Sequence, residues 1–81
     1  MPDTMALVTG VVPRPGERCF VSGVASYDVT RPFWLYVERT QDAFMPGWVY
    51  LIGRPIREDG TVKDRCRLYC FVAALRVARA R

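Results

Sequence analysis

Hydrophobic and polar residues alternate over short runs along most of the chain, and Gly or Pro separates each run from the next. Alternation with a period of two is typical of β-strands with one buried face, and Gly and Pro are typical of the turns between them. The runs are too short for long helices and are rich in Val, Tyr, Trp and Phe. The pattern predicts strands over residues 6–12, 18–25, 33–39, 47–53 (reaching 56 in a longer interpretation) and 61–72.

Two local signals refine this prediction. Asp59-Gly60 is typical of a tight hairpin turn, so the strands on either side of it should pair antiparallel. Near the C-terminus, Phe71, Ala74 and Leu75 fit one face of a helix, whereas Leu75 and Val77 alternate as in a strand. We interpret this region as a single helical turn at 72–75 followed by a short strand.

Five or six short strands, with no helix to cover a flat sheet, predict an all-β fold that rolls into a small barrel. Rolling up buries one face and protects the edges of the sheet. SH3-like and OB-like barrels both satisfy this pattern. At 81 residues the chain forms one domain, 1–81, in which residues 1–5 are expected to be a terminal tail.

The alternation divides the central strands into two faces. One is mainly aliphatic and predicts the barrel core: Phe33, Leu35, Val37, Val49, Leu51, Cys66, Leu68, Cys70 and Val72. The other carries most of the aromatic rings, together with Glu38 and Ile52, and its rings are Trp34, Tyr36, Trp48, Tyr50, Tyr69 and Phe71. We expect these rings to form one continuous outer surface bordered by Arg65 and Arg67.

Such a surface has three interpretations. The rings are core residues if a bulge, for which Gly53 and Pro55 are candidate sites, exchanges the two faces. Alternatively they bind a protein partner or a second copy, since Trp, Tyr and Arg are common hot-spot residues and monomers rarely expose such a patch. They also suit nucleic acid, with rings stacking on bases and Arg on phosphates. The candidate binding residues are Trp34, Tyr36, Trp48, Tyr50, Arg65, Arg67 and Tyr69.

The charge is placed unevenly along the chain. Residues 54–81 hold eight Lys and Arg against three Asp and Glu, whereas residues 1–53 hold four against five. A basic half indicates an anionic partner, such as nucleic acid or an acidic protein face. The alternative is that the excess of Arg reflects composition alone.

The residue types argue against catalysis. There is no His, which removes imidazole base catalysis and the commonest zinc ligand. No Gly-rich phosphate loop precedes the single lysine, Lys63. We therefore predict no catalytic residues, no metal site and no cofactor.

The cysteines and the apolar runs bear on the compartment. Cys19, Cys66 and Cys70 are interpreted as reduced, mostly buried thiols that act as small apolar residues, which indicates the cytoplasm. We expect no signal peptide. The longest uncharged run, 43–53, has eleven residues and is too short to span a membrane. We therefore expect a cytoplasmic protein that binds no membrane.

The segment 67–75, Arg-Leu-Tyr-Cys-Phe-Val-Ala-Ala-Leu, resembles the end of many SH3-like barrels, where a strand, a helical turn and a last strand follow one another. It is also similar to the tail of the plasmid-borne, trimethoprim-insensitive dihydrofolate reductases, which read V-Q-I-Y-P-V-A-A-L. The resemblance covers about ten residues with one inserted position. It implies an SH3-like barrel that forms a tetramer around a pore for NADPH and dihydrofolate. Arg67, Leu68 and Tyr69 would then occupy the pore-lining triplet, with Arg67 in place of the family's Gln.

Taken together, the sequence predicts a non-catalytic binding or adaptor module that binds a protein partner or itself. A single-stranded nucleic-acid or DNA-binding accessory protein is the alternative, and a reductase of the barrel type is the remote one. The small size and Arg-rich composition are in the style of an accessory protein from a plasmid, phage or other mobile element.

Overall fold

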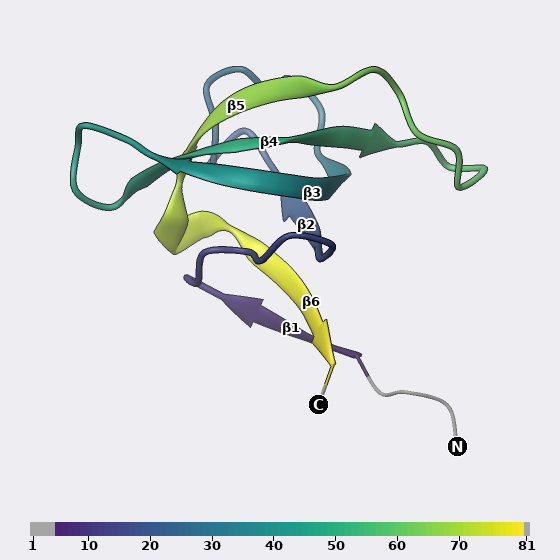
Figure 1. The fold of residues 1–81 in the computed structure, drawn as a ribbon, viewed down its shortest axis with the longest axis horizontal. Coiled ribbons are helices and arrows are strands. Elements are labelled where there is room, and N and C mark those ends of the chain that lie inside the picture. Colours follow the sequence, from purple (N-terminus) through teal and green to yellow (C-terminus); the bar gives the residue numbers. More distant parts are fainter. Residues whose placement is uncertain (1–4, 81) are drawn as a thin grey trace.

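The computed structural model describes residues 5–80, and over this range the chain forms six strands joined by turns and one short 3₁₀ turn, η1 (Val72–Ala74) (Figure 1). The strands are β1 (Met5–Thr9), β2 (Arg18–Val21), β3 (Phe33–Asp42), β4 (Trp48–Ile56), β5 (Cys66–Phe71) and β6 (Arg76–Ala80). They form one antiparallel sheet in the order β1-β6-β2-β3-β4-β5. The all-β prediction is therefore confirmed. The helical turn lies where the sequence predicted it, between two strands.

Several strand boundaries differ from the prediction. The strand predicted at 18–25 ends at Val21, because the carbonyl of Ser22 accepts hydrogen bonds from the amides of Ala25 and Ser26 and so starts a turn. The strand predicted at 61–72 begins only at Cys66. Residues 1–4 of the predicted tail lie outside the described residues, and Met5 is already the first residue of β1, paired with Ala80.

The connection between β4 and β5 is a wide turn with the predicted hairpin at its tip. The amide of Gly60 donates to the carbonyl of Arg57 at 2.9 Å, and Gly60 has a φ of 89°, which favours glycine. The amide of Lys63 then donates to the carbonyl of Pro55. This arrangement confirms the antiparallel pairing of the two strands and explains why 61–65 precede β5.

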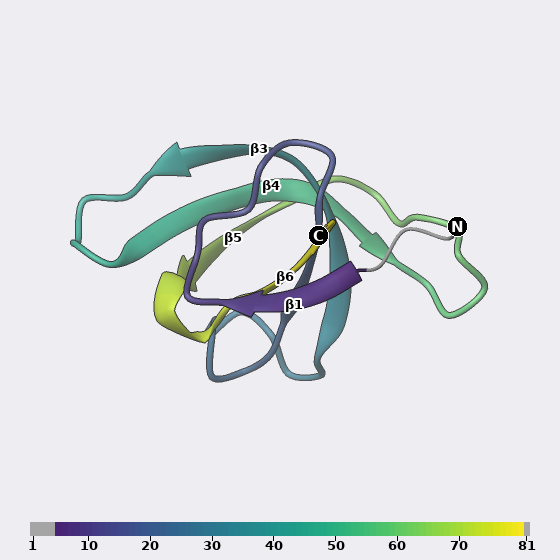
Figure 2. The same cartoon turned by 90° about the horizontal axis from the view of Figure 1, so that it is seen from below.

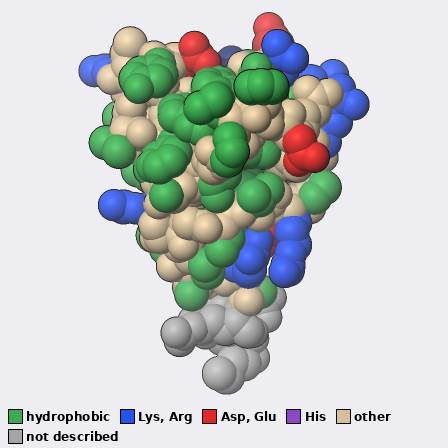
Figure 3. Space-filling view, turned by 90° about the vertical axis from the view of Figure 1, so that its left-hand side faces the viewer, with side chains coloured by type: hydrophobic (Ala, Val, Ile, Leu, Met, Phe, Trp, Pro, Cys, Tyr) green, Lys and Arg blue, Asp and Glu red, His purple; other side chains and the backbone are tan. Residues whose placement is uncertain are grey.

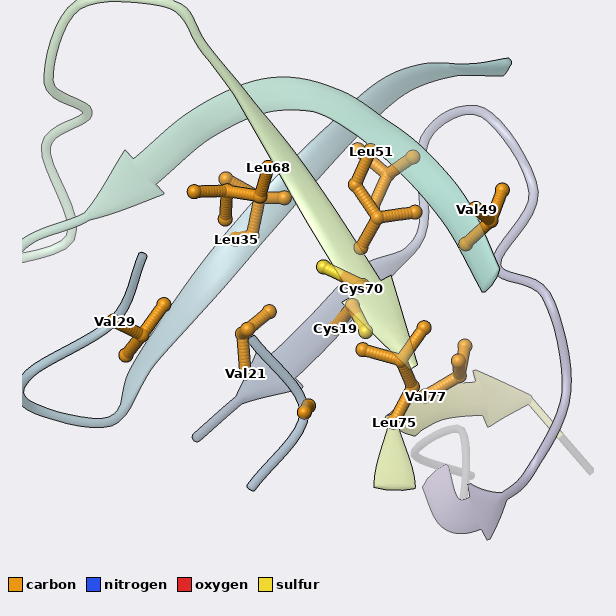
Figure 4. Close-up of a cluster of buried hydrophobic side chains, with 12 residues drawn as sticks. Cys19, Val21, Val29, Leu35, Val49, Leu51, Leu68, Cys70, Leu75 and Val77 are labelled. Carbon is orange, nitrogen blue, oxygen red and sulfur yellow. The ribbon is translucent and has the colours of Figure 1, made fainter. Parts of the chain in front are cut away.

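The sheet bends strongly, so that β1 and β6 lie below β3, β4 and β5 in Figure 1 and in front of them in Figure 2. Its concave face holds the core. Cys19 of β2 and Cys70 of β5 lie side by side there, although two strands, β3 and β4, stand between β2 and β5 in the sheet order (Figure 4). The buried cluster is Cys19, Val21, Ala25, Val29, Leu35, Val37, Val49, Leu51, Leu68, Cys70, Leu75 and Val77. The predicted aliphatic face is confirmed, with Phe33, Cys66 and Val72 only partly buried.

A β-bulge lies in β3. Val37 pairs with Gly53 and Arg39 pairs with Ile52, so Glu38 is an extra residue in β3 that has no partner in β4. A Cβ at Gly53 would collide with the carbonyl oxygen of Tyr36, so the two backbones approach more closely than a side chain allows. The bulge is thus next to Gly53, one of the two predicted sites, but its extra residue belongs to the partner strand. Such bulges increase the local bend and twist of a sheet.

The free edge of β5 is covered by the loop between β2 and β3. The amide of Phe71 donates to the carbonyl of Ala25 at 2.7 Å, and the hydroxyl of Ser26 donates to the carbonyl of Tyr69 at 2.8 Å. These bonds satisfy backbone groups that an edge strand would otherwise expose. They also hold the loop beside the outer aromatic residues of β5.

Within residues 5–80 no helix is long and apolar enough to cross a membrane.

Candidate functional site

Four of the seven predicted binding residues lie together on the convex side of β4 and β5. The rings of Trp48 and Tyr69 are stacked, with centroids 4.5 Å apart and planes 12° apart. Tyr50 contacts Tyr69 at 5.2 Å between centroids, and the guanidinium carbon of Arg67 lies 4.5 Å from the centroid of Tyr50. We call this group, with Phe71 at 5.3 Å from Trp48 and Tyr27 at 6.1 Å, the Trp48 cluster.

The strand register explains this arrangement. Trp48 pairs with Phe71, and Tyr50 pairs with Tyr69, so that the four rings lie on one face of the hairpin, with the Val49–Cys70 pair between them on the core face. Direct and diagonal cross-strand neighbours are close enough for aromatic rings to touch. The predicted outer face is therefore correct for these residues. Arg67 adds a cation–π contact, in which its guanidinium lies over the ring of Tyr50.

Exposed apolar side chains from two loops extend the Trp48 cluster. Phe44 and Met45 precede β4, and Val24 lies in the β2–β3 loop beside Tyr27. Phe44 is 96% exposed, Tyr27 87% and Val24 80%. Figure 3 views the end of the molecule at which the β3–β4 loop lies, and hydrophobic side chains gather over the upper part of this face.

A small hollow lies within this apolar surface. Its volume is about 230 Å³, and it is lined by Val24, Ser26, Tyr27, Trp48 and Phe71. The amide of Val72 donates to the carbonyl of Gly47, and a turn bond joins Trp48 to Met45, so the β3–β4 loop is held against the end of β5. The hollow itself is formed where the β2–β3 loop meets the start of β4 and the end of β5. We call the whole surface the apolar face.

Ile52 belongs to the same convex side but is only 6% exposed. It lies outside the core cluster, and its Cα partners are Arg39 and Arg67. The aliphatic stems of arginine can cover a neighbouring apolar side chain while the charged ends stay in water. Ile52 is thus buried on the outer side of the sheet, apart from the core cluster.

Trp34 and Tyr36 lie elsewhere, at the other end of β3. Trp34 packs edge-on against Phe20, with ring centroids 5.3 Å apart, and Tyr36 pairs with Arg18 and Arg54. Among residues 5–80, no ring contact joins this pair of residues to the Trp48 cluster. Trp34 instead lines a wide groove of about 1360 Å³, which we call the Trp34 groove. The single continuous surface that the sequence predicted is divided into two.

Arg65 is engaged in an ion pair. Its guanidinium donates two hydrogen bonds to the carboxylate of Glu38, the bulge residue, and Arg54 lies 3.6 Å from the same carboxylate. The Arg65 side chain holds the pKa of Glu38 below its usual value, and Glu38 raises the pKa of Arg65. Because this pair is exposed, it contributes little to stability. It does, however, direct Arg65 toward the bulge.

Several exposed or partly exposed apolar residues were not among the predicted binding residues. Val24, Tyr27, Phe44 and Met45 lie in loops, where alternation does not apply, and Phe20 was not among the predicted outer rings. A usable signal existed: apolar side chains between Gly and Pro turn residues are unexpected in a solvated loop. Alternation within strands makes no prediction about the exposure of loop residues.

The triplet implied by the reductase resemblance is split between two sides of β5. Leu68 belongs to the core, whereas Arg67 and Tyr69 lie in the Trp48 cluster. Within residues 5–80, no three His, Cys, Asp or Glu side chains are grouped as a metal site requires. Comparison with protein-family models, curated proteins and solved structures gives no match to this chain.

Proposed function

We propose that this protein is a non-catalytic binding module whose apolar face docks on a protein surface, either that of a different protein or that of a second copy. The observation that supports it is the exposure of Phe44, Tyr27 and Val24 around the Trp48–Tyr69 stack. Contiguous apolar surface of this kind is costly in water, and on soluble proteins it marks sites of association.

The composition of the apolar face supports a protein partner over nucleic acid at this position. The rings of Trp48, Tyr69 and Tyr50 already contact one another or Arg67, so little of their faces is available for stacking on a base. What remains available is the apolar rim contributed by the loops. Aromatic anchors surrounded by apolar contacts are typical of hot spots in protein interfaces.

The first experiment measures self-association. Sedimentation equilibrium of the full chain over a wide range of concentration is compared with that of Phe44→Ser and of Val62→Ser. Val62 is an exposed apolar residue in the β4–β5 connection, outside the apolar face. Docking of a second copy predicts a dimer that Phe44→Ser weakens at least tenfold and Val62→Ser leaves unchanged.

A monomer in that experiment directs the test to a different protein. A photoreactive benzophenone amino acid placed at position 44 should then give discrete protein crosslinks in cells, and the same group at position 62 should not. Equal yields at the two positions would refute docking on the apolar face. A tetramer that binds NADPH would instead support the reductase interpretation.

We further propose that the bent sheet is a small barrel of the SH3-like or OB-like class. The loop that covers the edge of β5, together with the order of strand, 3₁₀ turn and strand at the C-terminal end, supports the SH3-like form. The buried thiols of Cys19 and Cys70 support an assignment to the reducing cytoplasm, since both act as small apolar core residues.

A further inference from the structure

The Trp34 groove has an aromatic and aliphatic floor. Phe20, Trp34 and Ile56 lie on one rung that crosses β2, β3 and β4, and their side chains share the convex side of the sheet. Phe20 and Trp34 contact edge to face, with planes 61° apart, which leaves both rings only partly covered. The groove is open to solvent and also includes Met5, Leu7 and Ala78 from the β1–β6 pair.

Four cationic side chains line this floor from separate parts of the chain. Arg18 belongs to β2, Arg31 precedes β3, and Arg57 and Lys63 belong to the β4–β5 connection. Two carboxylates, Asp28 and Glu58, also line the groove, so the cations outnumber the anions by two to one.

Most of these cations have no partner within the described part of the chain. Arg57 donates to the hydroxyl of Thr61 and the carbonyl of Val62 and so supports its own turn. Arg18, Arg31 and Lys63 make no side-chain hydrogen bond or ion pair there. By contrast, Glu17 and Glu38 each hold an arginine elsewhere on the surface. The groove therefore presents three donors that are available to an anionic ligand.

We propose that the Trp34 groove binds single-stranded nucleic acid, with an unpaired base against Trp34 and phosphates on Arg18, Arg31 and Lys63. A planar ring among separated cations suits a ligand that alternates flat bases with negative charges. A duplex does not offer its bases to a ring, because they are stacked and paired. An acidic peptide would use the cations and leave Trp34 without a flat partner.

The two tryptophans make a selective test practical. Trp48→Phe leaves Trp34 as the only indole, and the emission of this variant is titrated with oligothymidylate of about 12 nucleotides, a length within the usual site size. We expect saturable quenching that weakens steeply between about 50 and 200 mM salt. Absence of quenching at the lower salt would overturn the proposal.

Charge variants locate the phosphate contacts. Arg31→Gln and Lys63→Gln should each weaken binding several-fold and reduce the slope of log K against log salt by about 0.7, the value for one phosphate contact on a single strand. Arg39→Gln is the matched control, since Arg39 is exposed on β3, outside the groove. An equal loss in the control would mean that only the overall positive charge matters, and the proposed site would be wrong.

The contribution of the ring is tested by Trp34→Leu in the protein that retains Trp48, with binding followed on a labelled oligonucleotide. Loss of stacking on one base should weaken binding about tenfold. Displacement of the oligonucleotide by polyglutamate of the same charge, with no dependence on Trp34, would identify an acidic peptide as the ligand instead. Phe44→Ser should leave oligonucleotide binding unchanged. The proposal for the Trp34 groove can therefore fail while the proposal for the apolar face holds, and the reverse.

Discussion

The indole of Trp48 stacks on the phenol ring of Tyr69 across the β4–β5 hairpin, with ring centroids 4.5 Å apart. Their direct cross-strand partners are Phe71 and Tyr50, so Trp48 and Tyr69 are diagonal neighbours on the convex face. This contact joins the two strands at the side of the sheet away from the core. Tyr27 of the β2–β3 loop stacks on Trp48 in turn, with ring centroids 6.1 Å apart.

The stack should contribute measurably to stability. A double-mutant cycle with Trp48→Leu and Tyr69→Leu is expected to give a coupling of about 0.5–1.5 kcal/mol in the free energy of unfolding, measured in urea. A second cycle with Trp34→Leu and Tyr69→Leu serves as the control, because these rings share no contact. It should be additive within about 0.5 kcal/mol. Equal coupling in both cycles would contradict a specific stack.

Ser26→Ala tests the attachment of the β2–β3 loop to β5. Ser26 is buried, its hydroxyl donates to the carbonyl of Tyr69, and its oxygen accepts from the amide of Asp28. Loss of the hydroxyl leaves these groups without their partner, and we expect a cost of about 1–3 kcal/mol in unfolding free energy. The hydroxyl of Ser22 makes no hydrogen bond within residues 5–80, so Ser22→Ala should lower the unfolding free energy much less. Similar costs for both variants would show that the loop is not held in this way.

Gly53→Ala tests the bulge in β3. The added methyl group would meet the carbonyl oxygen of Tyr36 and the Cα of Val37, both on the neighbouring strand. The strands must separate to accept it, so the unfolding free energy should fall by roughly 3 kcal/mol or more. Gly60→Ala is the comparison, because Gly60 has open space around it and only its φ of 89° is unfavourable. That variant should cost about 1–2 kcal/mol, and a larger cost than that of Gly53→Ala would refute the close approach.

The ion pair of Glu17 with Arg79 predicts a dependence of stability on pH. Arg79 donates two hydrogen bonds of 2.8 Å to the carboxylate and lowers the pKa of Glu17 from 4.5 to about 2. A carboxyl with a lowered pKa in the folded state stabilises above its unfolded pKa, and this contribution is lost as the pH falls from about 5 to 2. Urea unfolding at several pH values should therefore show a loss of about 1–3 kcal/mol that Glu17→Gln reduces. An unchanged pH profile in Glu17→Gln would assign the loss to other groups.

The three thiols should react at different rates in the folded protein. Burial raises the pKa of Cys19 and of Cys70 to about 12, whereas Cys66 is only partly buried. At pH 8 only about one in ten thousand of such buried thiols is ionised, and reagent access is poor as well. Mass spectrometry after brief alkylation should find Cys66 modified first, and Cys66→Ser should remove this fast phase. Early modification of Cys19 would contradict the packing of the core.

Much of the fold follows from local sequence. The alternation of Leu35 and Val37, and of Val49 and Leu51, correctly predicted which residues face the core, because a strand has a period of two wherever it lies. Asp59-Gly60 predicted the hairpin for a similar reason, since turn conformation depends on adjacent residues. The short turn before the last strand was also predicted from neighbouring residues alone.

The candidate surfaces depended on tertiary structure. The outer positions of Trp34 and Trp48 follow from alternation, but the register pairs Trp34 with Ile56, at the opposite end of β4 from Trp48, so the two indoles lie on separate surfaces. The apolar face also needs Tyr27 and Phe44, whose loops are each held to residues 71–72 by hydrogen bonds between distant segments. Local sequence was therefore enough to predict the presence of the strands, their buried sides and the hairpin, because these depend on neighbours along the chain, although several strand ends were placed wrongly. Which exposed residues share a surface could be seen only in the folded chain, because that depends on strand register, curvature and loop contacts between residues far apart in sequence.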